Sequence, residues 1–480
     1  MTSIRFDPAE NELFWRAIRE IPGYPAGEEI PLRRLLIESG AMYRLPEVLA
    51  SVSPTSKGGV LAVMDDTPMR RGTDDLKALV LGVLRDAGWE PTPLVLEPDG
   101  SGQVHTDLHH IETVKAHIRA GQAVISIGSG VVTDIAKHAC FLYEKETSNP
   151  IPYVVYQTAN SVSAYTSNMA PVFIGGVKRT LPSRYPDALI SDLETLADAP
   201  REMTVAGVGD LLAAFISFPD WYLAYRLGMD PQYNELPHAL MGGLDEILWA
   251  YAGEIRQCSL PGMAVLAKLI HLAGLAMSLT HATTPLSGYE HVMSHVLDMI
   301  NEEGGHPLAP HGTQVALASL VCRQAYQAFI DRFEPAEVSI ERCYPSPERM
   351  RAHILEVFSE VDPTGKAGEE CWSDYQVKLE HWSGKRTYLQ AFLADWPQIR
   401  ARIQSLARPP ETILKIIQAV NAPIHFNELD PPISEAEACF AFLNAPLMRR
   451  RLTLGDALIF FQWDRQKLWE EIWKRMSLQK

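Results

Sequence analysis

Short apolar runs alternate with helical patterns between residues 58 and 192. The first three runs are GVLAVMDD, PTPLVLEP and AVISIGSG, and the segments between them, DDLKALVLGVLRDAG and HHIETVKAHIRAG, have the apolar spacing of helices. The pattern continues with PYVVYQT, PVFIGG and ALISD and ends near Asp192. Strands that alternate with helices in this order predict a parallel sheet with right-handed crossovers. We therefore expect an α/β domain in this part of the chain.

Beyond residue 197 the pattern becomes helical, and strand signals of comparable strength do not occur there. The periodic apolar stretches are 208–227, 236–256, 262–280, 288–301 and 311–332. The segment 345–385 has the least regular pattern. The sequence thus predicts an N-terminal extension at 1–55, an α/β domain at 56–196 and an all-helical domain at 197–480.

The composition is that of a globular protein of about two domains. The chain has 480 residues, 46% hydrophobic content and a net charge of −16. Nucleic acids and anionic membranes attract basic surfaces, so this charge argues against either as a standing partner. An anionic substrate would need a local basic pocket.

Several features favour a cytoplasmic protein. Six cysteines are scattered without a CxxC pair, as expected for reduced thiols. The start, MTSIRFDPAENELFW, has no basic leader followed by an apolar run, so we expect no secretory signal. The most membrane-like stretch, PGMAVLAKLIHLAGLAMSLT, is interrupted by Lys268 and His271. A buried core helix is the better interpretation of that stretch.

A glycine-rich turn follows the run AVISI. Gly128, Ser129 and Gly130 lead directly into a helical pattern, so backbone N–H groups converge where a pyrophosphate could bind. The GxGxxG fingerprint is incomplete, because Thr133 stands at the third glycine position. A tight turn without a ligand explains this feature alone about equally well.

Two acids end the first apolar run of the same unit. Asp65 and Asp66 lie where a carboxylate can accept hydrogen bonds from a ribose diol. Nearby Arg70 or Arg71 could accommodate a 2′-phosphate. Solvated acids at the end of a strand are the competing interpretation.

Four residues in the helical part are candidates for metal chemistry. Asp210 follows two glycines in AGVGDLLAAF, His291 and His295 share one helical face in EHVMSH, and His311 opens the pattern HGTQVALASL. One carboxylate and two imidazoles leave an open position on a divalent ion. Taken singly, Asp210 is better explained as a helix cap and His311 as a structural histidine. Their joint occurrence with the glycine turn favours a metal-assisted redox enzyme.

The order of these motifs resembles the sn-glycerol-1-phosphate dehydrogenases, within the iron-containing alcohol dehydrogenase and dehydroquinate synthase-like superfamily. The resemblance rests on GSGVVTDIAK, TANSVSAYTS, GVKRTLPSRYPDALISDLETLADAP, AGVGDLLAAFISFPDW, SGYEHVMSHVLD and HGTQVALA, and extends to APLMRRRLTLGDAL. It implies a dinucleotide-binding α/β domain and a helical metal-binding and catalytic domain. It also implies a cytoplasmic homodimer.

The resemblance implies a role for each matching residue. Asp210, His291 and His311 would be the metal ligands, and His295 would lie beside the reacting carbon or the nicotinamide. The cofactor, NAD or NADP, would be bound by Gly128, Ser129, Gly130, Asp65, Thr158, Ser161 and Lys178. The metal is expected to be zinc, with nickel or iron as alternatives. The implied reaction is reversible reduction of dihydroxyacetone phosphate to sn-glycerol 1-phosphate.

The sequence departs from the family near the substrate. Where the family reads S-x-D-G, this chain has Ser163 and Ala164, which removes a carboxylate and changes substrate recognition. Thr313 replaces the family's glutamate after the histidine-glycine pair. Two alternatives remain: a sugar-phosphate cyclase of the dehydroquinate synthase type, and a non-catalytic nucleotide-binding relative. The cyclases ordinarily offer glutamate where this chain offers Asp210.

Overall fold

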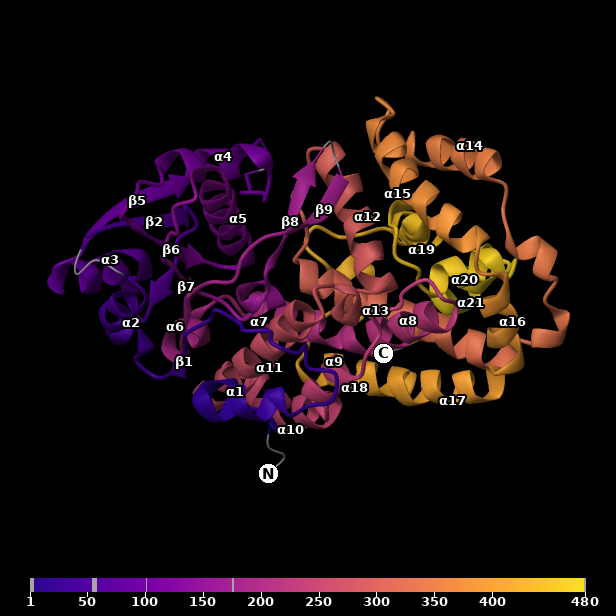
Figure 1. The fold of residues 1–480 in the computed structure, drawn as a ribbon, viewed down its shortest axis with the longest axis horizontal. Coiled ribbons are helices and arrows are strands. Elements are labelled where there is room, and N and C mark those ends of the chain that lie inside the picture. The colour runs from indigo at the N-terminus through magenta and orange to yellow at the C-terminus, as the bar shows by residue number, and fades with distance from the viewer. Residues whose placement is uncertain (1–3, 54–57, 101, 175–176, 479–480) are drawn as a thin grey trace. The chain divides into compact units, whose positions relative to one another are not determined.

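A computed structural model describes residues 4–53, 58–100, 102–174 and 177–478. The chain divides into two compact units. The first unit comprises Met1–Ile174, Lys178–Leu211 and Leu236–His281, and the second comprises Gly175–Val177, Leu212–Glu235 and Ala282–Lys480. Figure 1 shows the strands gathered in the first unit and the long helices of the second.

The first unit is built on a six-stranded parallel sheet with the order β1-β10-β7-β6-β2-β5. The strands are β1 (Arg34–Glu38), β2 (Gly59–Asp65), β5 (Glu90–Leu96), β6 (Ala123–Gly128), β7 (Tyr153–Gln157) and β10 (Ala188–Asp192). Every residue of three of the four interior strands, β6, β7 and β10, is buried. Strands covered on both faces need continuous apolar runs, which is why the sequence pattern predicted them. The expected α/β fold with a parallel sheet is confirmed.

Helices cover both faces of this sheet (Figure 1). The helices of the first unit are α1 (Glu12–Arg19), α2 (Leu45–Val52), α3 (Leu76–Asp86), α4 (Leu108–His117), α5 (Gly130–Thr147), α6 (Leu193–Asp198), α7 (Arg201–Leu212), α9 (Leu236–Leu240), α10 (Leu244–Arg256) and α11 (Leu260–Leu279). Buried residues of α2 and α3 form one core cluster with the sheet. Asp75 and Asp107 cap α3 and α4 by accepting backbone N–H groups of the first turn, which fixes where these helices begin.

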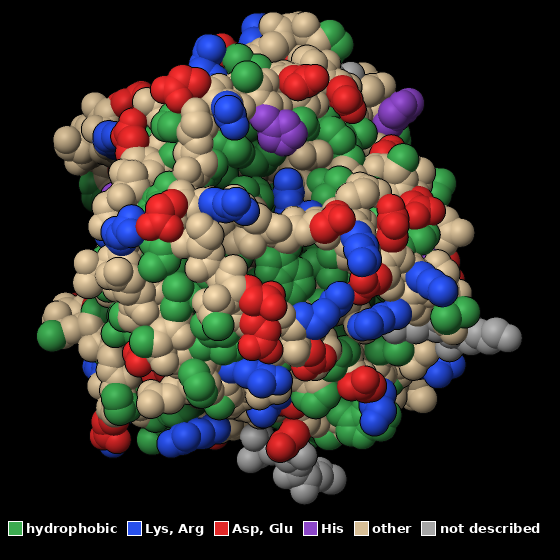
Figure 2. Space-filling view, turned by 90° about the vertical axis from the view of Figure 1, so that its right-hand side faces the viewer, with side chains coloured by type: hydrophobic (Ala, Val, Ile, Leu, Met, Phe, Trp, Pro, Cys, Tyr) green, Lys and Arg blue, Asp and Glu red, His purple; other side chains and the backbone are tan. Residues whose placement is uncertain are grey.

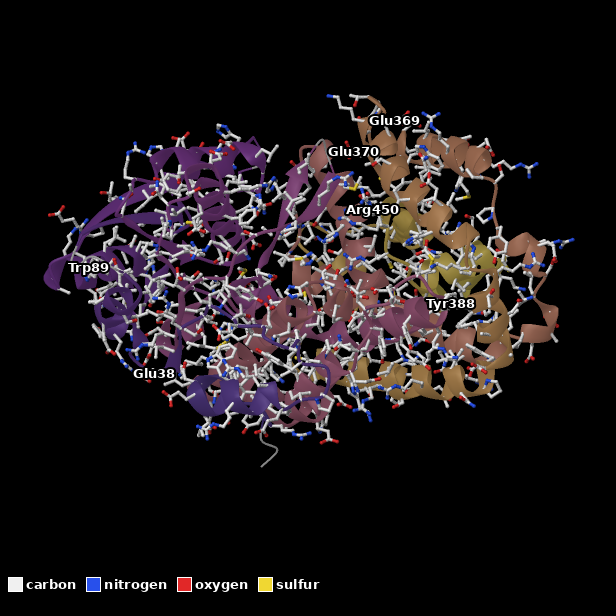
Figure 3. The ribbon with its side chains drawn as sticks, in the orientation of Figure 1. Glu38, Trp89, Glu369, Glu370, Tyr388 and Arg450 are labelled. Atoms are coloured by element: carbon white, nitrogen blue, oxygen red, sulfur yellow. The ribbon has the colours of Figure 1, made fainter. Side chains whose placement is uncertain are left out.

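The segment 1–55, expected as an extension, contributes to the α/β unit. β1 pairs in parallel with β10, from Arg34 opposite Ala188 to Glu38 opposite Asp192. Leu35, the second residue of β1, is only 1% exposed. Figure 3 labels Glu38, the last residue of this edge strand. The strand is short and two arginines precede its apolar residues, so its apolar pattern is weak.

The run PVFIGG lies outside the main sheet. β8 (Met169–Ile174) pairs with β9 (Val177–Pro182) in a separate two-stranded sheet, and the two glycines of the run lie outside the described residues. β3 (Arg70–Arg71) and β4 (Asp74–Asp75) form another short pair. An apolar run predicts a strand but does not say which sheet the strand joins.

The described part of the second unit is mainly helical. Its helices are α8 (Ala214–Arg226), α12 (Tyr289–Glu303), α13 (His311–Arg332), α14 (Pro347–Phe358), α15 (Lys366–Ser383), α16 (Arg386–Ala394), α17 (Trp396–Ala407), α18 (Pro410–Ala419), α19 (Glu435–Asn444), α20 (Leu454–Phe460) and α21 (Arg465–Ser477). α12 packs along α13, and α8 packs against both. On the face shown in Figure 2, acidic and basic side chains alternate around apolar ones.

Two expectations about the helical part differ from the structure. The segment 345–385 is mostly helical in α14 and α15, so the expected irregularity is wrong. The helices α9 to α11 belong to the first unit, although the sequence placed the boundary near 197. α11 packs against β1 and α6 of that unit. Helical periodicity shows that a helix has a buried face but does not show which core receives it.

Among the described residues, two helical stretches are long and apolar enough to cross a membrane by length and composition, Arg201–Arg226 and Leu260–Leu279. Of their apolar windows, 89% and 83% are buried. Burial of this extent is typical of core helices, as the sequence predicted for the second stretch.

The contact between α7 and the loop after β7 provides a stability test. A methyl group on Gly207 would lie 2.0 Å from the backbone oxygen of Asn160. We expect Gly207→Ala to lower the free energy of unfolding by about 1–3 kcal/mol, because the helix must move away from the loop. The control is Gly253→Ala in α10, where a methyl group meets nothing within 4 Å. Gly253→Ala should raise stability by about 0.5–1 kcal/mol. Equal urea midpoints for the two variants would contradict this packing.

Candidate metal and cofactor site

The glycine turn of the first unit has no side chains that would keep another group away from its backbone at Gly128 and Gly130. β6 ends at Gly128, Ser129 precedes α5 without capping it through its side chain, and α5 begins at Gly130. A methyl group on Gly130 would lie 2.5 Å from Cγ2 of Val162. The Thr158 N–H donates to the Gly128 carbonyl (3.2 Å). The turn, the helix N-terminus and the loop after β7 therefore lie together, an arrangement suited to a phosphate group.

Asp65, at the end of β2, is paired with a lysine that the sequence analysis did not single out. Lys77 Nζ lies 3.0 Å from Oδ1 of Asp65, and Thr67 donates to Oδ2. The lysine also donates to the Asp65 and Thr67 carbonyls. Asp65 is thus held in place by a cation in the first turn of α3 and is not simply a solvated acid.

Arg71 is engaged with acids at the end of β10. Its guanidinium pairs with Asp192 at 3.0 Å and with Glu194 at 3.3 Å. Asp192 is fully buried and also accepts from the Met42 N–H. These ion pairs give Arg71 a structural role in joining the β3 segment to the sheet.

The loop between β7 and β8 fixes the carboxylate of Asp210. The Ser163 N–H donates to Oδ2 of Asp210 (2.9 Å). Ser161 lies earlier in this loop, and its hydroxyl is 3.2 Å from the Tyr165 hydroxyl. α7 begins at Arg201, so Asp210 stands near its end and the helix-cap interpretation is wrong.

Lys178 lies in β9, with Nζ 5.4 Å from the centre of the Phe173 ring. Its charge also acts on Asp134 of α5 and opposes the rise in that carboxyl's pKa, which burial dominates. Lys178 is therefore a β9 residue whose charge acts on α5.

Three histidines gather in the second unit. His291 and His295 lie on one face of α12, and His311 is the first residue of α13. The ring centres are 5.2 Å apart for His291 and His311, 5.6 Å for His295 and His311, and 6.3 Å for the two histidines of α12. The structure therefore brings together the predicted histidines.

The hydrogen bond of His291 Nδ1 decides which ring nitrogen keeps a lone pair. Nδ1 of His291 lies 2.8 Å from Oε1 of the fully buried Glu290. A carboxylate only accepts, so Nδ1 bears the hydrogen and Nε2 keeps its lone pair. The same oxygen accepts from the Gly288 N–H, which fixes the carboxylate. Pairing of a ligating imidazole with a carboxylate is usual at metal sites. The sequence analysis missed Glu290, although it directly precedes His291.

A hydrogen-bond relay gives His311 the same tautomer. Gln314 Nε2 donates to Asp298 Oδ1 and to the Ala309 carbonyl, each at 3.0 Å, which leaves its Oε1 as acceptor. Ser294 donates to that oxygen, so its hydroxyl accepts from Nδ1 of His311 at 3.0 Å. Nε2 of His311 therefore also keeps its lone pair. Asp298 therefore belongs to this relay.

The third histidine has a different neighbour. Nη2 of Arg449 lies 3.1 Å from Nδ1 of His295. Arg449 is 7% exposed and follows the short helix η8 (Ala445–Met448). It lies in the stretch APLMRRRLTLGDAL but was not among the predicted site residues.

Asp210 lies at the boundary of the first unit, two residues before Leu212, within the helical stretch Arg201–Arg226. Asp210 and His291 are buried, and His311 is intermediate. A carboxylate and imidazoles with little exposure have the ligand chemistry of zinc and iron sites.

Behind His291 lies a second buried carboxyl group. Asp220 of α8 accepts from the Tyr289 N–H (2.7 Å), the Leu454 N–H (2.8 Å) and the Tyr326 hydroxyl. Burial raises the pKa of Asp220 to about 8, and the charge of nearby Glu290 adds to this rise.

Part of this chain is similar in sequence to known dehydrogenases. A model of the iron-containing alcohol dehydrogenases matches residues 36–200. The glycerol-1-phosphate dehydrogenase (NAD(P)+) of Halalkalibacterium halodurans is 30% identical over 250 residues, 52% of this chain and 61% of that protein. The enzyme of that name from Bacillus velezensis is 31% identical over 269 residues, 54% of this chain and 64% of that protein. Residues 36–200 of this chain are thus similar to the iron-containing alcohol dehydrogenases. The chain spans about three fifths of the length of these relatives.

Solved structures with much lower sequence identity share the fold of this chain. 2-epi-5-epi-Valiolone synthase from Streptomyces hygroscopicus subsp. jinggangensis, with NAD+ and Zn2+ bound, has a TM-score of 0.53 at 14% identity. The match covers 94% of this chain and 98% of that one. At this identity the similarity shows the fold alone.

In this protein, Asp220 should make stability depend on pH. Its folded pKa lies above the ordinary value, so its stabilising contribution is complete below about pH 4 and is lost as pH rises toward 8. The loss is at most about 1.4 kcal/mol per pH unit. We expect Asp220→Asn to have a lower free energy of unfolding than the wild type at low pH. This free energy should not show the fall with rising pH that Asp220 causes in the wild type. Urea midpoints at pH 5, 6.5 and 8 for both proteins measure the difference. Parallel pH curves would show that Asp220 is ionised throughout.

Proposed function

We propose that this protein is a metal-dependent NAD(P)H oxidoreductase. It would reversibly reduce a ketone phosphate, such as dihydroxyacetone phosphate, to sn-glycerol 1-phosphate. The main supporting observation is the histidine cluster, in which His291 and His311 both present an Nε2 lone pair. Relatives named glycerol-1-phosphate dehydrogenase support the redox chemistry and the cofactor.

The proposed metal ligands are Asp210, His291 and His311. Two imidazoles of fixed tautomer and one carboxylate suit a divalent ion such as zinc, iron or nickel. Such an ion, when bound, would draw charge from the carbonyl oxygen as the hydride arrives. Helix continuity supports the participation of Asp210: it lies one turn before α8, which packs against α12 and α13.

The first unit would bind the cofactor. Gly128, Ser129 and Gly130 would receive the pyrophosphate at the start of α5. Asp65 would accept from the adenosine ribose, while Lys77 beside it offsets its charge, so that a 2′-phosphate is also tolerated. Thr158, Ser161 and Lys178 would lie on the nicotinamide side. We therefore propose that both NADH and NADPH are used.

The proposed substrate would contact Ser163, where the side chain differs from that of the family that the sequence resembles. The Ser163 backbone binds Asp210, whereas its side chain replaces the acid that the resemblance leads us to expect. A short hydroxyl leaves more space and no negative charge. A ketone phosphate bulkier than dihydroxyacetone phosphate is therefore within the proposed substrate class.

Cofactor oxidation tests the reaction. Metal-loaded protein with NADH or NADPH and a panel of ketone phosphates should show loss of absorbance at about 340 nm and form the corresponding alcohol phosphate. Conversion of a sugar phosphate with no net cofactor oxidation would instead identify a cyclase, as the fold of 2-epi-5-epi-valiolone synthase allows. Bound cofactor without turnover of either substrate class would identify a non-catalytic relative.

Metal retention tests the ligand set. We expect His291→Ala to lower the metal content from about one ion per chain to near zero and to reduce turnover by at least about 100-fold. The matched control is His381→Ala, because His381 lies exposed in α15 of the same unit. Elemental analysis after dialysis measures the metal. Equal metal content in both variants would remove His291 from the ligand set.

A further inference from the structure

The contact between Arg449 and His295 determines how this third histidine can act. The nitrogen pair is buried, and the two residues are 154 positions apart in the sequence. Arg449 follows η8, which packs against both α12 and α15. Its neighbour Leu452 is 4% exposed and Thr453 caps α20, so both ends of this segment are fixed.

An arginine has hydrogen-bond donors but no acceptor. Nδ1 of His295 must therefore accept, and in the neutral ring Nε2 bears the hydrogen. This tautomer is opposite to that of His291 and His311, whose Nδ1 atoms donate. Two rings can bind a cation through Nε2, while the third presents an N–H group.

The positive charge of Arg449 also favours cation binding by His291 and His311 over His295. A guanidinium at hydrogen-bond distance repels a cation from the ring it contacts. The ring of His295 stacks on that of His311 at 5.6 Å with an interplanar angle of 18°. An N–H donor and a candidate metal ligand are therefore direct neighbours.

We propose that Arg449 is a positioning residue that holds His295 as an Nε2–H donor to the reacting oxygen of the substrate. This proposal rests on the proposed oxidoreductase function. A hydrogen bond from His295 strengthens as negative charge develops on that oxygen. His295 thus acts by donating a hydrogen bond and keeps its own proton, so the proton that converts the alkoxide to the alcohol is taken from water.

The test replaces Arg449 and, as a matched control, its neighbour Arg450. Arg450 is 64% exposed at its side chain and pairs with Asp374 at 2.7 Å (labelled in Figure 3). Arg449→Met and Arg450→Met remove the same charge from adjacent positions. We expect Arg449→Met to retain its metal and lose roughly 10- to 100-fold in kcat and in kcat/KM together, with KM little changed. Arg450→Met should keep at least half of the kcat. Arg449→Lys, which retains a donor, should recover part of the loss.

A direct readout separates positioning from structural damage. In zinc-loaded protein containing 15N-histidine, the His295 signals, assigned with His295→Gln, should show a protonated Nε2 and an unprotonated Nδ1. Arg449→Met should lose this tautomer or mix it with the other, while the signals of His291 and His311 keep a protonated Nδ1.

The outcomes are distinguishable. A protonated Nδ1 in the wild type, or equal kcat in Arg449→Met and Arg450→Met, overturns the role of Arg449. If the expected tautomer is found but no ketone phosphate is reduced, the proposed function fails while the Arg449–His295 arrangement stands. Loss of metal from Arg449→Met and Arg449→Lys alike would overturn the proposal in favour of a structural role.

Discussion

The second ring nitrogen of each clustered histidine is the constraint on which the proposed chemistry depends. An imidazole has two nitrogens, and the partner of one decides what the other can do. A carboxylate at His291, a serine relay at His311 and a guanidinium at His295 therefore give three similar rings different properties. Rings within 6.3 Å of one another would otherwise compete for the same ion.

Burying these partners requires further hydrogen bonds. Glu290 is fully buried and Asp220 is 2% exposed, and an unpaired carboxylate in such a place is costly. Backbone N–H groups of Gly288, Tyr289 and Leu454 meet this need. Gly288 is required for a second reason, because a methyl group there would lie 2.6 Å from Asp220 and 2.8 Å from Glu290. The glycine of SGYEHVMSH thus allows both acids to approach the backbone.

The sequence predicted the fold wherever burial produced a long pattern. The central strands and α12 and α13 are covered on most sides, so their apolar spacing is clear. β1 is a short edge strand preceded by arginines, and helical periodicity does not identify the core that receives α9 to α11. The spacing of His291 and His295 predicted a shared face. Their partners were harder to predict, because Glu290 does not share that face and Arg449 is distant in the chain.

The loop that supports Asp210 would separate the proposed metal binding from the proposed substrate recognition. A methyl group on Gly274 of α11 would lie 2.2 Å from the Thr166 hydroxyl and 2.6 Å from the Ser163 carbonyl, so this helix fixes the loop by backbone contact. Ser163 binds Asp210 through its N–H, which any residue except proline provides. A change of side chain at position 163 would therefore alter the surface offered to the proposed substrate and leave the support of Asp210 intact. This physical independence explains how a chain can keep all the proposed metal ligands while departing beside them from the family that it resembles.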